Sequence, residues 1–133
     1  MMRKMDMASQ SVWFKVGAVC GAISVLLGAF GAHGLKSKVS SKSVETWNTA
    51  AHYQLVHSLV LLMVPMATNP DVSGGLFLAG IVFFSGSLYM LVLTGRGFPF
   101  GPMTPIGGLC HYQSLVSVVF AVPLENRITI FIK

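Results

Sequence analysis

The sequence predicts an all-α integral membrane protein: a single domain over residues 1–133, built as a bundle of about four transmembrane helices with short loops. Residues 74–94, GGLFLAGIVFFSGSLYMLVLT, contain no Asp, Glu, Lys or Arg. At about 1.5 Å per residue they form a helix of roughly 31 Å, close to the ~30 Å thickness of a bilayer's hydrocarbon core. Charged residues make up 10% of the chain and hydrophobic ones 53%, whereas soluble domains carry about 25% charged residues. We therefore expect a lipid bilayer as the principal partner.

The first predicted span covers residues 13–33. Trp13 would lie at the membrane interface, and Lys15 would extend its ammonium group to the headgroups. Small residues recur at spacings of four and three, so they share one helical stripe that lets another backbone approach closely. Two interpretations of the stripe stay open, packing within the chain or the seam of a homo-oligomer. The predicted helix-packing residues are Gly17, Gly21, Ser24, Gly28 and Gly31.

Residues 1–32 also admit a second interpretation, as a cleaved secretory signal. Arg3 and Lys4 would be its basic start, and the small residues at 28–32 would form its cleavage region. The glycine stripe favours a retained helix instead, because a discarded peptide needs no packing face.

A second helix is expected after the polar loop HGLKSKVSSKS at residues 33–43. Ser43 is the expected N-cap, and Glu45 would lie in the first turn, where the helix dipole favours an acid. The first turns are amphipathic, and the spanning part is predicted over residues 50–67. Pro65 would bend or end this helix.

The third and fourth spans are predicted over residues 74–94 and 106–122. The Asn-Pro-Asp sequence within 68–73 is typical of a turn before the third span. Three prolines and three glycines within 95–105 exclude regular structure there. The fourth span carries several polar residues, so both a spanning and a shallow position stay open for it.

The net charge of +5 comes from basic residues spread thinly between apolar segments. Such residues set topology and meet anionic lipid headgroups, and no basic run with interleaved aromatics indicates nucleic-acid binding. With four spans the two sides hold five and four basic residues, too even to decide orientation. We place both termini on the cytoplasmic or matrix side, and the membrane stays open between plasma and mitochondrial.

Histidines near or within the spans are the candidates for chemistry, because ionisable groups inside a membrane are costly. We expect a polar cluster of His33, Tyr53, His57 and Thr104 at the mouth of the bundle. Its plain interpretation is a neutral imidazole that hydrogen-bonds neighbouring helices. The alternative is a site for a haem, a quinone or a small solute.

No pattern in the sequence indicates an enzyme. Metal-type histidine spacing, a serine-histidine-acid set and a glycine-rich phosphate loop before a helix are absent from the sequence. Asp and Glu are absent from all four predicted transmembrane spans, which disfavours an ion-coupled transporter. The sequence therefore predicts a non-enzymatic scaffold or accessory protein without a cofactor. A small-solute carrier or a redox anchor that uses the histidines is the alternative.

Five short motifs follow one another along the chain: GAFGAHGL at 28–35, YQ at 53–54 with His57 three residues on, SGSLY at 85–89, LTG at 93–95 and TPIGG at 104–108. Their order and spacing resemble the transmembrane protein 256-like family, also described as domain of unknown function 423. The resemblance covers residues 13–108 and implies a four-helix membrane protein with no assigned activity. After Gly108 the chain departs from the family's pattern. Members of the family continue with a strongly apolar helix that contains a tryptophan, whereas this chain continues with LCHYQSLVSVVFAV.

Overall fold

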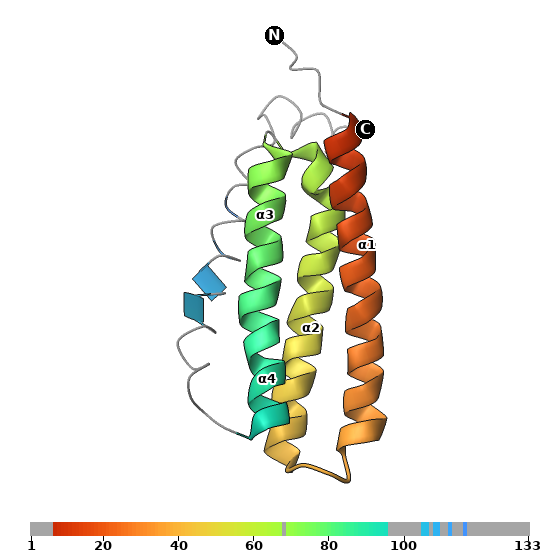
Figure 1. The fold of residues 1–133 in the computed structure, drawn as a ribbon, viewed down its shortest axis with the longest axis vertical. Helices are drawn as coiled ribbons and strands as arrows, with labels where there is room; N and C mark the ends of the chain where they lie inside the picture. The colour runs from red at the N-terminus through yellow and green to blue at the C-terminus, as the bar shows by residue number, and fades with distance from the viewer. Residues whose placement is uncertain are drawn as a thin grey trace, which may run out of the picture.

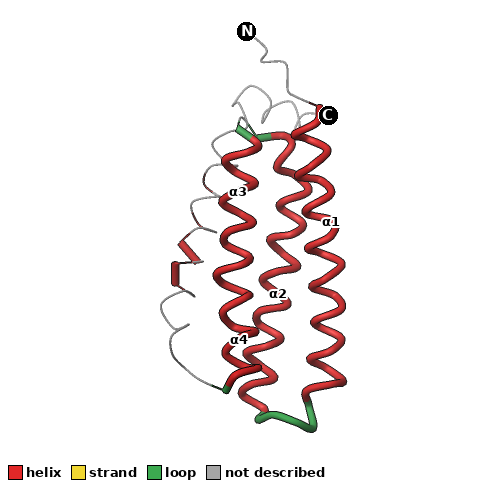
Figure 2. The backbone as a smooth tube through the Cα atoms, viewed as in Figure 1, coloured by secondary structure: helices red, strands yellow, loops and turns green. Residues whose placement is uncertain are grey.

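A computed structural model describes residues 7–67 and 69–95 of the chain, with side chains from residue 12 onward. In these residues every secondary-structure element is a helix, and short loops join the helices, which confirms the predicted all-α class (Figure 2). Three long helices are described, so the predicted count of four is not confirmed. Thr104 and most of the predicted span 106–122 lie outside the described residues. Beyond residue 95 the structure describes Pro105, Ile106, Gly108, Leu109, Tyr112 and Val116.

The first two helices form an antiparallel hairpin (Figure 1). Helix α1 (Met7–Phe30) continues into one wide turn, η1 (Gly31–Leu35). After a short loop, α2 (Ser41–Met63) returns alongside α1 and ends in the tight turn η2 (Val64–Met66).

The third long helix is made of three consecutive segments. Helix α3 (Pro70–Gly80) passes into the wide turn η3 (Ile81–Ser85), which passes into α4 (Gly86–Thr94). This helix runs antiparallel to α2 and in the same direction as α1 (Figure 1). The predicted span 74–94 lies within it, since the helix begins earlier, at Pro70.

The start of α2 differs from the prediction. Ser40 is the N-cap, and its hydroxyl oxygen accepts a hydrogen bond from the backbone N–H of Ser43 at 3.2 Å. The expectation that Ser43 caps the helix is therefore wrong, and so is the placement of Glu45 in the first turn. Several serines in this loop are competent caps by residue type, and the sequence alone does not rank them.

Proline and glycine set the helix ends. Pro65 lies in the tight turn that closes α2, where its missing N–H ends the helical ladder. Pro70 occupies the first turn of α3, where a missing N–H costs nothing. Gly95 ends α4 in the left-handed conformation at φ 62°, which glycine adopts without strain.

Apolar side chains are packed at both ends of the bundle. Near the α2–α3 turn, the buried cluster consists of Leu61, Val64, Phe77 and Ile81. Near the α1–α2 loop, the buried cluster consists of Leu35, Trp47 and Val92. Between these two clusters the buried side chains are largely small or polar.

Large apolar side chains cover the outside of the helices, as with Leu26, which is 70% exposed, and Leu93, which is 60% exposed. Serines, a glutamine and a histidine are buried instead. Two helical stretches, Val12–Leu35 and Pro70–Thr94, are long and apolar enough to cross a membrane. A polar interior and an apolar exterior reverse the pattern of a soluble bundle, and they match a lipid environment.

Candidate functional site

Gln54 lies at the centre of a polar layer between the two apolar clusters. Its side chain is only 6% exposed. Its Nε2 donates to the carbonyl oxygen of Cys20 on α1 at 3.0 Å, and its Oε1 accepts from the hydroxyl of Tyr89 on α4 at 3.1 Å. One amide on α2 thus joins all three helices, and both ends of the amide are satisfied.

Buried serines complete the polar layer. Ser58 donates to the carbonyl oxygen of Gln54 at 2.6 Å, and Ser24 donates to that of Gly21 at 2.7 Å. These hydroxyls bond to their own helix, which allows a small polar side chain to lie in a membrane interior at little cost. Among the described residues, Ser85 on η3 holds the one buried side-chain polar atom without a hydrogen-bond partner.

His57 is buried among aromatic side chains on the side of α2 that faces α3. It is 6% exposed, and its ring centroid lies 6.0 Å from that of Tyr53 and 6.2 Å from that of Phe77. Its Nδ1 lies 2.7 Å from the carbonyl oxygen of Tyr53. A carbonyl only accepts, so Nδ1 carries a proton, and the ring orientation is fixed by a neighbour one turn earlier on the same helix.

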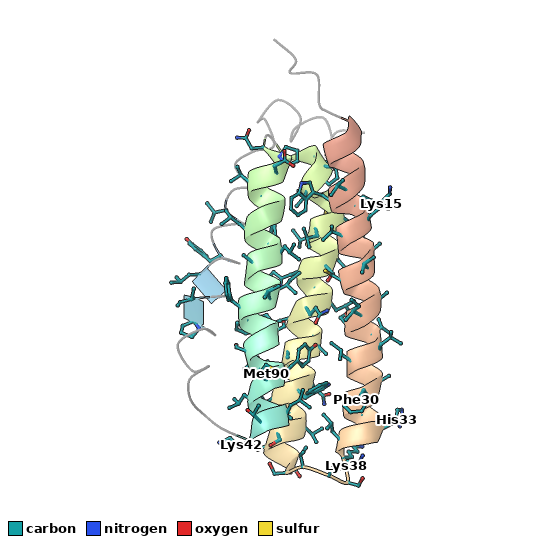
Figure 3. All side chains as sticks on the ribbon, viewed as in Figure 1. Lys15, Phe30, His33, Lys38, Lys42 and Met90 are labelled. Carbon is teal, nitrogen blue, oxygen red and sulfur yellow. The ribbon has the colours of Figure 1, made fainter. Side chains whose placement is uncertain are left out.

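The structure brings two members of the predicted polar cluster together. The rings of Tyr53 and His57 are stacked at an interplanar angle of 14°. His33 is exposed at the end of α1, and Figure 3 shows its side chain directed away from the bundle. Thr104 lies outside the described residues. The cluster as a set of four therefore stays a prediction.

The predicted glycine stripe of α1 faces α2 of the same chain. A Cβ added at Gly17 would lie 3.0 Å from the backbone nitrogen of Leu62. Cβ atoms added at Gly21 and Gly28 would make ordinary contacts, at 3.7 Å and 3.9 Å, with α2. The stripe is thus used inside the chain, and its closest contacts lie at its two ends, at Gly17 and at Gly31, which is covered by the Trp47 ring. The second interpretation of the stripe, as the seam of a homo-oligomer, stays a prediction.

Sequence reasoning missed how the two tryptophans are used. Trp47 is 2% exposed, packs over Gly31, and donates its indole N–H to the carbonyl oxygen of Leu27 at 2.7 Å. At the other end of the bundle, Trp13 packs over Gly74 in the same manner. The sequence prediction placed Trp13 at the membrane interface and assigned neither ring a partner. The sequence signal available was a tryptophan near each end of the bundle with a glycine on the neighbouring helix.

The polar layer offers little for metal binding. Within residues 12–67 and 69–95, no three His, Cys, Asp or Glu side chains come close enough to hold a metal ion. Gln54, Ser24 and Ser58 use their polar side-chain atoms in hydrogen bonds between or within helices. The arrangement can hold helices in register, and its single buried imidazole is a candidate for ligand contact.

Comparison with known proteins gives a family and no activity. Residues 27–108 match the model of the family described as "Protein of unknown function (DUF423)". A UPF0382 membrane protein of Staphylococcus haemolyticus is 46% identical over 111 residues, covering 80% of this chain and 90% of its own. The UPF0382 membrane protein YwdK of Bacillus subtilis is 38% identical over 117 residues, covering 83% and 94%. A UPF0382 membrane protein of Schizosaccharomyces pombe is 38% identical over 107 residues, covering 74% of this chain and 90% of its own. No solved structure matches.

Proposed function

The chain belongs to the DUF423 family and is a membrane protein, and from that premise we propose that it is a four-span, non-enzymatic scaffold or accessory protein. The observation that carries the proposal is the side-chain amide of Gln54, which bonds to both α1 and α4. A polar group bonded on both sides stabilises a helix arrangement and is not available to a substrate. The interior thus supports a rigid apolar surface offered to lipid or to another membrane protein.

The four-span topology is part of this proposal. Residues 106–122 are 17 residues long, which corresponds to a helix of about 26 Å, just short of a hydrocarbon core. A fourth crossing would return the chain to the side on which α1 begins. The continuous helix Pro70–Thr94 and the span Val12–Leu35 would then be two of the four.

Cysteine accessibility tests two of these crossings, α2 and the helix Pro70–Thr94. Single cysteines replace Ser41 and Val72, which are exposed at opposite ends of the bundle, and Phe98, which falls in the segment 95–105 that the sequence predicts to be irregular. The parent chain has Cys20 and Cys110 replaced by serine. A membrane-impermeant maleimide added to sealed vesicles should label positions 41 and 98 from one side and position 72 from the other. Labelling of positions 41 and 72 from the same side would contradict a spanning α2.

A second experiment separates the scaffold from the carrier or redox anchor. Those alternatives are supported by the burial of His57 between Tyr53 and Phe77. The protein is purified from its own membrane and its visible spectrum recorded, then it is reconstituted and solute flux is measured for the wild type and His57→Gln. The scaffold predicts no bound chromophore and no flux. A haem or flavin band, or flux lost in His57→Gln while the fold is kept, would overturn it.

A further inference from the structure

The loop between α1 and α2 has a fixed shape. Leu35 is buried, and Val39 packs with it in the cluster around Trp47. The backbone N–H groups of Lys38 and Val39 both donate to the carbonyl oxygen of Leu35, at 2.9 Å and 3.1 Å. Apolar anchors on the inner side of the loop leave its polar residues directed outward.

Three exposed lysines lie at this end of the bundle, two in the loop and one in the first turn of α2, and we call them the basic loop surface: Lys36, Lys38 and Lys42. Residues 7–44 contain no Asp or Glu. The first acid that follows is Glu45, and in the described part of the chain no ion pair joins it to these lysines. The positive charge of this surface is therefore not neutralised within the described chain.

The basic loop surface lies at the end of an apolar, lipid-facing helix. Phe30 is 46% exposed on α1, six residues before Lys36. At 1.5 Å per residue, about 9 Å along the helix separates them, and a lysine stem can span several ångströms more. Figure 3 shows Lys38 and Lys42 at this end and Lys15 near the other. In a membrane, the ammonium groups of the basic loop surface would thus lie at the depth of the lipid headgroups, and Phe30 at the depth of the acyl chains.

We propose that the basic loop surface binds the headgroup of an anionic phospholipid, whose acyl chains lie along the exposed apolar side of α1. An anionic phospholipid supplies both a negative phosphate and an apolar chain, which are the two complements this end of the molecule presents. The proposal rests on the membrane location of the chain and does not depend on the scaffold role. Each lysine close to an anionic leaflet contributes about a fivefold preference at moderate ionic strength, and salt weakens it.

Native mass spectrometry of the full chain released from micelles tests the proposal, with phosphatidylglycerol and phosphatidylcholine as equimolar probes. We expect the wild type to retain phosphatidylglycerol about 25-fold over phosphatidylcholine, which corresponds to two lysines at about fivefold each. Lys38→Gln should lower the ratio about fivefold, and the triple variant Lys36→Gln/Lys38→Gln/Lys42→Gln should abolish it. The matched control Lys15→Gln removes the same charge from an exposed position of α1 at the far end of the bundle and should lower the ratio less than Lys38→Gln does.

Further arms keep the test decisive. The triple lysine-to-arginine variant preserves charge and should keep the preference, which separates charge from loss of fold. Equal retention of both lipids by the wild type would overturn the proposal, and so would an equal loss in Lys15→Gln and Lys38→Gln. Displacement of phosphatidylglycerol by excess inorganic phosphate would identify a free-anion site and would also overturn it.

Discussion

The indole N–H of Trp13 on α1 donates a hydrogen bond to Oδ1 of Asp71 in the first turn of α3, at 2.9 Å. At the opposite end, Trp47 on α2 donates to the carbonyl oxygen of Leu27 on α1 at 2.7 Å. Each ring covers a glycine of the helix to which it bonds. Along α1 and the start of η1, Trp13 and Gly31 are about 27 Å apart at 1.5 Å per residue, nearly the thickness of a bilayer's hydrocarbon core. A tryptophan thus joins two helices near each end of the bundle.

Gly74→Ala should destabilise the protein. A Cβ at Gly74 would lie well inside contact distance of the Trp13 indole, so the ring must move and its bond to Asp71 is lost. Forced overpacking of this kind costs about 1–3 kcal/mol. The measurement is the free energy of unfolding in mixed micelles titrated with sodium dodecyl sulfate.

The adjacent substitution Gly75→Ala is the control. A Cβ at Gly75 meets nothing within 4 Å, and alanine favours a helix over glycine by up to about 1 kcal/mol. We expect unchanged or slightly raised stability. Equal losses at both positions would show that the Trp13–Gly74 contact does not hold α1 to α3.

Substitutions along the α1 stripe should follow the tightness of its packing. Gly17→Ala places a methyl group 3.0 Å from the backbone nitrogen of Leu62 and the carbonyl oxygen of Ser58, and backbone cannot move aside cheaply. Gly28→Ala places one 3.9 Å from Ala51, an ordinary contact. We expect a loss of about 1–3 kcal/mol for the first and little change for the second. The measurement is thermal unfolding of both variants in one detergent. Equal losses for the two variants would contradict this packing of α1.

Gln54 and Tyr89 should be energetically coupled. Tyr89→Phe removes the hydroxyl that donates to Gln54, and hydrogen bonds between membrane helices are worth about 0.6 kcal/mol on average. Gln54→Leu removes this bond and the one to Cys20 together. A double-mutant cycle should give a coupling of about 0.5–1.5 kcal/mol. Strict additivity would mean that the two side chains do not interact in the folded protein.

Ser85→Ala should leave stability unchanged or raise it. The Ser85 hydroxyl is buried without a hydrogen-bond partner, and an unsatisfied buried polar group costs about 1–3 kcal/mol. Ser58→Ala is the comparison, because it removes a hydroxyl that is bonded to the carbonyl oxygen of Gln54. Ser85→Ala should therefore be the more stable of the two variants, and the opposite order would contradict this account.

Part of the candidate site could be predicted and part could not. The pairing of Tyr53 with His57 follows from residues four apart lying on one helical face, and the structure stacks their rings. The bonds of Gln54 to Cys20 and Tyr89 span 34 and 35 residues of sequence. Helical periodicity gives the face on which Gln54 lies, but it does not state which side chains of other helices arrive at that face.

The sequence by itself determined the helical class, the membrane environment and the small-residue face of α1. These properties are local, because they follow from hydrocarbon-length apolar runs and from a repeat close to 3.6 residues. Only the tertiary structure decided that Ser40 caps α2, that Gln54 joins three helices, and that each tryptophan lies over a glycine of its neighbour. Those outcomes depend on the relative depth and rotation of packed helices, which are set by contacts between residues far apart in the chain.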